Sequence, residues 1–143
     1  MSAPRYAELQ VTSPFSFLRG ASSAEELFAT AAMMGIEALA VTDRNTLAGV
    51  VRAWEAAKAT GVRLVVGCRL DLACGMALLV YPMDRAGYGR LCRLLTLGKS
   101  RAGKGRCHLD WSDVVEHAEG LIAVLVPDMA DDTCALRLRR LRD

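Results

Sequence analysis

Five polar or charged residues lie where three predicted strands end, and their types limit the chemistry available there. They are Gln10 and Thr12, Asp43 and Arg44, and Arg69. In parallel α/β folds, ligand and metal sites lie at the carboxyl ends of the strands, so these residues form the candidate cleft. Among the five, only Asp43 has the carboxylate, imidazole or thiolate group that transition metals prefer.

The two arginines also argue against metal binding in the candidate cleft. A guanidinium stays protonated and has no lone pair to offer a metal, but it pairs well with a carboxylate. We therefore expect Arg44 and Arg69 to lie near Asp43. The alternative is that Asp43 caps the following helix and Arg44 pairs with another nearby carboxylate.

Hydrophobic periodicity places these residues on a regular alternation of strands and helices. Parallel strands are predicted near 7–12, 37–42, 62–67, 76–81 and 121–126, in one curved sheet with right-handed crossovers. Helices are predicted near 23–34, 46–60 and 85–98, the first with a Ser23–Glu26 capping box, followed by a helical tail over 130–143. In the helix over 46–60, with Asn45 as its cap, Val51 and Trp54 are predicted to share an apolar face.

Length and composition favour one globular domain, since the chain has 143 residues, is 52% hydrophobic and carries a net charge of +2. Its apolar runs fall short of the roughly 18 residues needed to span a bilayer, so no membrane association is expected. The start of the sequence lacks the apolar core of a signal peptide, which predicts a cytoplasmic protein. The five cysteines are odd in number and scattered, as is typical of free thiols.

A basic connector and two weaker patterns complete the candidate sites. Lys99, Arg101, Lys104 and Arg106 follow the third helix, and we expect either a solvated surface or contact with DNA phosphate or an acidic partner. The letters GKS at 98–100 resemble part of a P-loop, but they lack the earlier glycine and the preceding strand. Cys107, His108, His117 and Cys134 do not match the usual spacing of a structural zinc site.

Three stretches, "ELQVTSPFSFLRGAS", "ALAVTDRNTLAGVVRA" and "RLVVGCRLDL", resemble successive motifs of a known family. This is the PHP domain at the N-terminus of bacterial C-family, DnaE-like DNA polymerases, in particular the error-prone branch used in damage-induced mutagenesis. The resemblance implies a (β/α) barrel with outer helices, and residues 1–143 would supply only the N-terminal part of its seven strands. It also implies that the polymerase core is absent from this chain.

Active PHP domains hold metals with an HxH motif, a Thr-Asp-His turn and a later Glu, and this sequence departs from that pattern. Gln10 and Thr12 occupy the HxH positions, Arg44 replaces the histidine, and Arg69 replaces the Glu. The resemblance therefore implies that arginine charge has taken the place of the metals, with no cofactor and no catalytic residue in this chain.

Three functions remain open at this point. The favoured one is a structural or protein-contact module that touches the polymerase core and other mutasome or replication proteins. The first alternative is a free-standing metal-dependent PHP phosphoesterase or exonuclease, and the second is a stand-alone binding protein. Because a partial barrel leaves a sheet edge open, we also expect self-association or cover from the tail helix.

Overall fold

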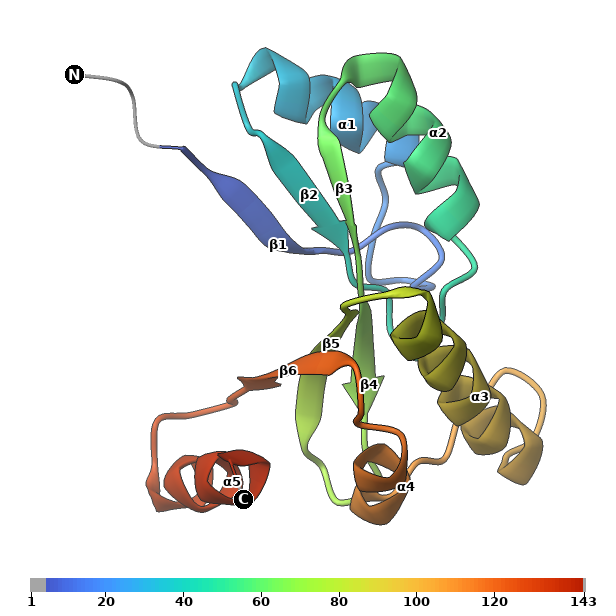
Figure 1. Ribbon diagram of the computed structural model, residues 1–143, viewed down its shortest axis with the longest axis vertical. Coiled ribbons are helices and arrows are strands. Elements are labelled where there is room, and N and C mark those ends of the chain that lie inside the picture. The colour runs from blue at the N-terminus through green and yellow to red at the C-terminus, as the bar shows by residue number, and fades with distance from the viewer. Residues whose placement is uncertain (1–4, 143) are drawn as a thin grey trace. The chain divides into compact units, whose positions relative to one another are not determined.

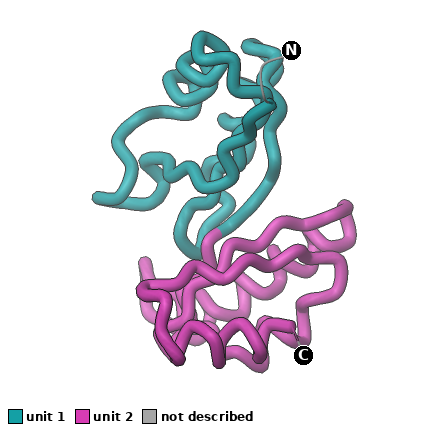
Figure 2. The backbone as a smooth tube through the Cα atoms, turned by 90° about the vertical axis from the view of Figure 1, so that its left-hand side faces the viewer, with its two compact units in different colours: residues 1–68 teal, residues 69–143 magenta. Residues whose placement is uncertain are grey.

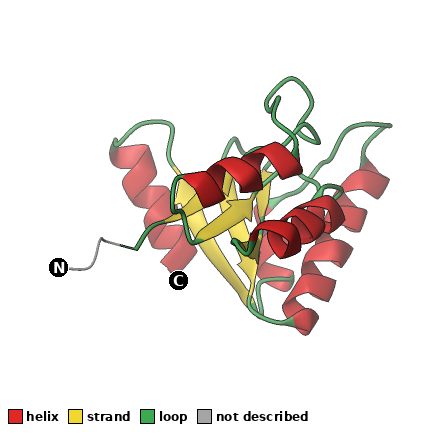
Figure 3. Ribbon diagram, turned by 90° about the horizontal axis from the view of Figure 1, so that it is seen from above, coloured by secondary structure: helices red, strands yellow, loops and turns green. Residues whose placement is uncertain are grey.

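The computed structural model describes residues 5–142, which alternate between helices and strands (Figure 3). The chain divides into two compact units, Met1–Cys68 and Arg69–Asp143, where its length predicted one domain (Figure 2). Each unit is a small α/β assembly with its own three-stranded sheet. The predicted α/β class is therefore confirmed.

Unit 1 contains the strand–helix alternation that the periodicity predicts. In chain order its elements are β1 (Ala7–Val11), α1 (Ala24–Met33), β2 (Ala38–Val41), α2 (Val50–Thr60) and β3 (Arg63–Val66). The three strands are parallel in the order β1-β2-β3, with Ala7 paired to Ala38 and Ala38 to Arg63. Figure 1 shows α1 and α2 side by side next to this sheet.

Helix α1 begins as predicted, whereas α2 does not. The Ser23 hydroxyl and the Glu26 carboxylate form the reciprocal capping box, and Gly35 follows the helix with φ +72°. Helix α2 begins at Val50 with Gly49 as its cap, so the prediction that Asn45 caps it is wrong. Asn45 instead adopts φ +51° in the preceding turn, a conformation that asparagine tolerates better than most residues.

The core of unit 1 is built from small side chains on α2 rather than large ones. Ala53, Ala56 and Ala57 are buried, while Val51 and Trp54 are exposed, so the predicted apolar face of this helix is wrong. The alanines let α2 approach α1, whose Phe28 is fully buried in the same cluster. Trp54 instead lies under the ammonium group of Lys58, which is 3.4 Å from its ring centre.

Unit 2 carries a second sheet in the order β4-β5-β6, with helices α3, α4 and α5. The bounds are β4 (Cys68–Asp71), β5 (Ala77–Pro82), α3 (Arg85–Arg101), α4 (Trp111–Glu116), β6 (Leu121–Val126) and α5 (Asp132–Arg142). Strands β5 and β6 are antiparallel, with Tyr81 opposite Ile122, so the predicted single parallel sheet is wrong here. Helices α3 and α4 connect β5 to β6 and bring the chain back to the end of β5. At that point, the Met83 N–H donates to the carbonyl oxygen of Gly120 at 2.9 Å.

The tail forms the predicted helix, α5, which contacts β6. None of its described residues is buried, so it gives β6 only partial cover. Residues 1–4 and Asp143, which belong to the predicted N-terminal segment and tail, lie outside the described residues. Over residues 5–142, no helix combines the length and the apolar character that crossing a bilayer requires.

The contact between α3 and the start of β6 gives a first test of unit 2. A Cβ atom on Gly87 would lie 2.3 Å from the carbonyl oxygen of Gly120, whereas one on Gly89 would meet only the Arg93 side chain at 3.7 Å. We expect Gly87→Ala to lower the free energy of unfolding by about 1–3 kcal/mol, because backbone must move. Gly89→Ala in the same helix is the matched control and should raise stability by up to about 1 kcal/mol. Urea denaturation measures both, and equal effects would contradict this packing.

Candidate functional site

The site is built where the first two parallel strands end together. Thr42 N–H donates to the carbonyl oxygen of Val11 at 2.8 Å, which aligns the end of β2 with the end of β1. The residue after Thr42 is Asp43, and the residues after Val11 begin the long loop that leads to α1. Parallel pairing therefore places this loop beside the Asp43 carboxylate.

Two serines of the loop bind that carboxylate directly. Ser13 donates its backbone N–H to Oδ1 at 2.9 Å and its hydroxyl to Oδ2 at 2.6 Å, and Ser16 donates its hydroxyl to Oδ1 at 2.7 Å. Asp43 is only 2% exposed, and both serines are buried as well. A buried carboxylate is costly unless hydrogen bonds satisfy it, and three donors do so here.

The two hydroxyls also accept hydrogen bonds from the backbone, which extends the network through both loops. Ser13 Oγ accepts from Phe15 N–H at 3.2 Å, and Ser16 Oγ accepts from Arg44 N–H at 2.9 Å. The Cys68 thiol donates to the carbonyl oxygen of Asp43 at 3.4 Å. A Cβ on Gly20 would lie 2.4 Å from the Ser13 carbonyl oxygen, so the loop closes on itself only with glycine there.

Of the predicted cleft residues, only Asp43 is central to this network. Gln10 is exposed in β1, where its N–H donates to the Glu8 carboxylate at 3.0 Å, and Thr12 is half-buried just past the strand. Arg44 joins the network through its backbone N–H. Ser13 and Ser16 were not among the predicted site residues, because serines in a turn carry no sequence signal of a buried carboxylate partner.

Arg69 belongs to unit 2, where its Nε donates to the Asp71 carboxylate at 2.8 Å. The carboxylate oxygens of Asp43 accept from Ser13 and Ser16 instead of from a predicted arginine. That the guanidiniums of Arg44 and Arg69 lie next to Asp43 stays a prediction.

The residues at this site do not fit a transition metal. Gln10 and Thr12 offer a neutral amide and a hydroxyl, which are weak ligands, and Asp43 already accepts three hydrogen bonds. Within residues 5–142, no group of three His, Cys, Asp or Glu side chains lies close enough to hold a metal ion.

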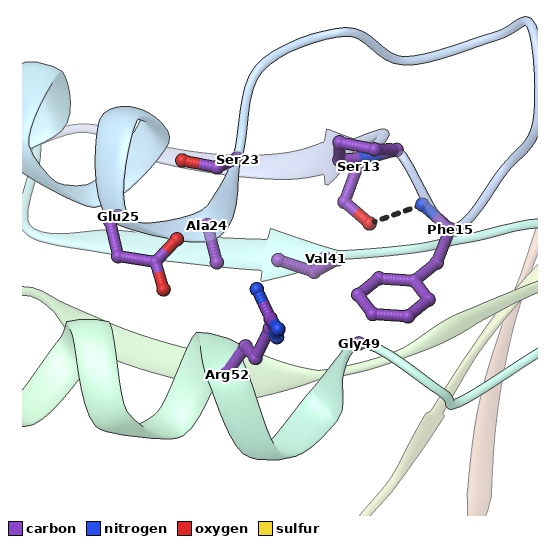
Figure 4. A pocket seen from close by; sticks show the side chains of 9 residues that line it. Ser13, Phe15, Ser23, Ala24, Glu25, Val41, Gly49 and Arg52 are labelled. Atoms are coloured by element: carbon purple, nitrogen blue, oxygen red, sulfur yellow. Dashed lines mark hydrogen bonds between the residues drawn. The ribbon is translucent and has the colours of Figure 1, made fainter.

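A pocket of about 250 Å³ opens beside the network, between the loop and the start of both helices (Figure 4). Pro14, Phe15, Ala24 and Val41 form its apolar wall. Glu25 and Arg52 bring opposite charges to its edge. The pKa of Glu25 is lowered by its own backbone N–H first, then by the Ser23 hydroxyl and by Arg52.

Lys99 and Arg101 lie in the last turn of α3, so the prediction that they follow this helix is wrong, and only Lys104 and Arg106 lie in the connector after it. Arg101 donates to the Asp113 carboxylate at 2.6 Å and so ties the end of α3 to α4. Over residues 5–142, the side chains of Lys99, Lys104 and Arg106 have no carboxylate partner. Their contact with DNA phosphate or an acidic partner stays a prediction.

The structure shows the surroundings of the GKS letters and of the two histidines. Lys99 and Ser100 lie inside α3, so the predicted loop setting of these two residues is wrong, and a helical setting is also unlike a P-loop. His117 Nδ1 lies 2.8 Å from the carbonyl oxygen of Asp113, and His108 Nε2 lies 3.5 Å from the Asp110 carboxylate.

The Asp43 network predicts a large stability effect for a small change. Asp43→Asn keeps the size of the side chain but removes the charge that the Ser13 and Ser16 hydroxyls bind. We expect the free energy of unfolding to fall by about 1.5–3 kcal/mol, the usual contribution of a hydrogen bond to a charged group. The exposed Glu55→Gln in α2 is the control and should change stability little. Urea denaturation at neutral pH measures both, and an Asp43→Asn protein as stable as its parent would contradict the network.

The Arg101–Asp113 pair predicts a pH dependence. The pKa of Asp113 is lowered below its ordinary 3.8, chiefly by the hydrogen bond from Arg101 and then by the Asp110 N–H. A carboxyl group with a lowered folded pKa adds stability that is full above its unfolded pKa and is lost as the pH falls through the folded value. We therefore expect Asp113→Asn to be less stable than the parent at pH 7, and the difference to shrink in acid, below about pH 4. Urea denaturation over a pH series measures this, and a difference that stays constant into acid would refute it.

Comparison with solved structures shows the fold. A Bifidobacterium adolescentis protein described as a metal-dependent phosphoesterase matches with a TM-score of 0.57 and 17% identity, over 82% of this chain and 44% of that protein. An amidohydrolase from Chromobacterium violaceum, with bound sulfate and no metal, matches with a TM-score of 0.55 and 24% identity, over 64% of this chain and 32% of that one. At these identities the likeness concerns the fold alone.

Comparison of sequences shows the family. Error-prone DNA polymerase 1 of Agrobacterium fabrum is 68% identical over 142 residues, and the error-prone DNA polymerase of Caulobacter vibrioides is 54% identical over 143. Each match covers 99% of this chain but only 13% of the relative, so the chain spans a small part of the length of these proteins. Residues 8–140 match the family model described as the PHP domain. The chain therefore belongs to the PHP domain family, with close sequence relatives among error-prone DNA polymerases.

Proposed function

We propose that this chain is a metal-free PHP module of an error-prone, DnaE-like DNA polymerase, with a structural or protein-contact role. The parent protein would carry out DNA-directed DNA synthesis during damage-induced repair and mutagenesis in the cytoplasm. Nucleotidyl transfer would belong to residues outside this chain, and the chain alone would be catalytically inactive. Its partners would be the polymerase core and other mutasome or replication proteins.

The observation that carries this proposal is the state of the Asp43 carboxylate. Asp43 lies at the end of β2, where the resemblance implies that active PHP domains have metal ligands. In this chain, both of its carboxylate oxygens accept hydrogen bonds from serines of the neighbouring loop. A metal clip joins loops by binding several side chains at once, and this hydrogen-bonded carboxylate joins the loops after β1 and β2 in the same way. The site thus supports a function in holding structure.

The arginines add to the proposal. By the resemblance, Arg44 and Arg69 stand where active PHP domains have two metal ligands. The fixed positive charge of an arginine opposes the binding of a cation. We propose that they supply charge near Asp43 where active relatives carry metals. If so, removing Arg69 lowers stability, by a few kcal/mol when the pair is buried and by much less when it is exposed.

The alternative is a metal-dependent phosphoesterase, the activity by which the Bifidobacterium adolescentis protein is described. It would require metal ligands other than those identified by the resemblance. A binding protein that acts alone would share the metal-free site, and the difference would lie in its partners.

Metal dependence separates the proposal from the enzyme alternative. We expect the purified protein to contain no stoichiometric zinc or manganese, to show no phosphodiesterase activity, and to keep its melting temperature when zinc or a chelator is added. The reason is that the serine donors, rather than a cation, satisfy Asp43. Elemental analysis, a phosphodiesterase assay and thermal unfolding measure these three properties.

Asp43→Asn is the matched variant for that experiment. It should be less stable than the parent whether or not zinc is present, and zinc should shift neither protein. If zinc raises the melting temperature of the parent but not of Asp43→Asn, a metal binds at Asp43 and the proposed function is wrong.

A further inference from the structure

The loop after β1 contains a turn that exposes two large apolar side chains. Arg19 N–H donates to Ser16 O at 2.9 Å, which makes Phe17 and Leu18 the two central residues of this turn. Their side chains are 84% and 86% exposed, and Leu18 has φ +60°. We call Phe17, Leu18 and Arg19 the loop tip.

The stability of this chain does not explain the residues of the loop tip. Leucine in the left-handed region costs about 1–2 kcal/mol, which glycine at the same position would avoid. An exposed Phe–Leu pair gains nothing from burial. A non-glycine residue held at a positive φ points to a function for the strained residue.

Hydrogen bonds that involve Ser16 hold the loop tip in place. Ser16, which accepts the hydrogen bond that closes the turn, donates its own hydroxyl to Asp43 at 2.7 Å. A rigid apolar projection loses little entropy when it binds, so it is suited to enter a preformed apolar site.

Such a site is present in unit 1. A groove of about 400 Å³ runs between β1 and α1, lined mainly by apolar side chains, among them Leu27, Ala31, Met34 and Ile36. Glu8 and Glu26 lie at the same groove. Their carboxylates accept hydrogen bonds from the Tyr6 hydroxyl and the Ser23 N–H, but over residues 5–142 neither forms an ion pair.

We propose that the loop tip of one copy of this chain inserts into the β1–α1 groove of a second copy. Phe17 and Leu18 meet the apolar lining, and the Arg19 guanidinium meets the carboxylates of Glu8 and Glu26. The tip does not fill the groove of its own chain, because its side chains are exposed. The two surfaces differ, so the contact is heterologous and builds rings or open chains of subunits.

A second copy suits the loop tip better than a nucleic acid does. Leucine has no ring to stack on a base, and the tip carries one cation where phosphate binding uses several. The proposal rests on the loop tip and the groove, so it stands or falls independently of the polymerase role.

Leu18→Gly gives the first test, by sedimentation velocity over a series of protein concentrations. We expect the parent to self-associate, and Leu18→Gly to weaken association by about tenfold or more, as the loss of an interface hot spot does. The same variant should melt at a higher temperature than the parent, because glycine relieves the backbone strain. A parent that stays monomeric at every concentration would overturn the proposal and would point to another polypeptide or a nucleic acid. Unchanged association of Leu18→Gly would also overturn it.

The groove gives a second, independent test. Met34→Lys puts a cation into the groove and should abolish association, whereas Met33→Lys, at an exposed neighbour outside the groove, should not. A mixture of Leu18→Gly, which keeps its groove, and Met34→Lys, which keeps its tip, should form a 1:1 dimer that grows no further. A mixture that stays monomeric would overturn the heterologous contact, and so would equal effects of the two lysine variants.

Discussion

A buried carboxylate must find hydrogen-bond donors, and this requirement shapes the end of the first sheet. Leaving Asp43 unsatisfied in the interior would cost several kcal/mol, which is a large share of the stability of a small domain. The Ser13 N–H and the two serine hydroxyls meet the requirement, and those hydroxyls in turn accept from Phe15 and Arg44. The conformation of the loop after β1 therefore depends on one side chain at the end of β2.

The same interaction connects fold, site and surface. Parallel pairing of β1 with β2 brings the loop to Asp43, and the carboxylate then fixes Ser16. Ser16 closes the turn that presents Phe17 and Leu18. In a PHP enzyme the corresponding strand ends would hold metals, so the proposed role follows from replacing a metal clip by a hydrogen-bonded one. In the proposed role, the loops stay joined without a metal.

Much of unit 1 could be predicted from the sequence, because its signals are local. The Ser23 capping box and the period of the apolar residues place α1, and short apolar runs place β2 and β3. The direction of β6 could not be predicted, since an apolar run reads the same in a parallel and an antiparallel pair. The buried face of α2 was missed because its contacts are made by alanines, while Trp54 remains exposed.

At the site, residue types alone identified Asp43 but not its partners. Ser13 and Ser16 are ordinary turn residues, and only the pairing of β1 with β2 shows that their hydroxyls meet a carboxylate some thirty residues away. Arginines were predicted as the partners of Asp43, because opposite charges attract at any spacing in the sequence. Short serine hydroxyls, which require a specific backbone path, carry no such signal.

A double-mutant cycle between Asp43→Asn and Ser16→Ala measures whether Asp43 acts through its serine donors. Urea denaturation of the parent, the two single variants and the double variant gives the coupling free energy between these side chains. We expect the two changes to be strongly non-additive, with a coupling of about 1 kcal/mol or more. Additive effects would show that Ser16 does not hold the carboxylate, which would contradict the proposed hydrogen-bonded joint between the two loops.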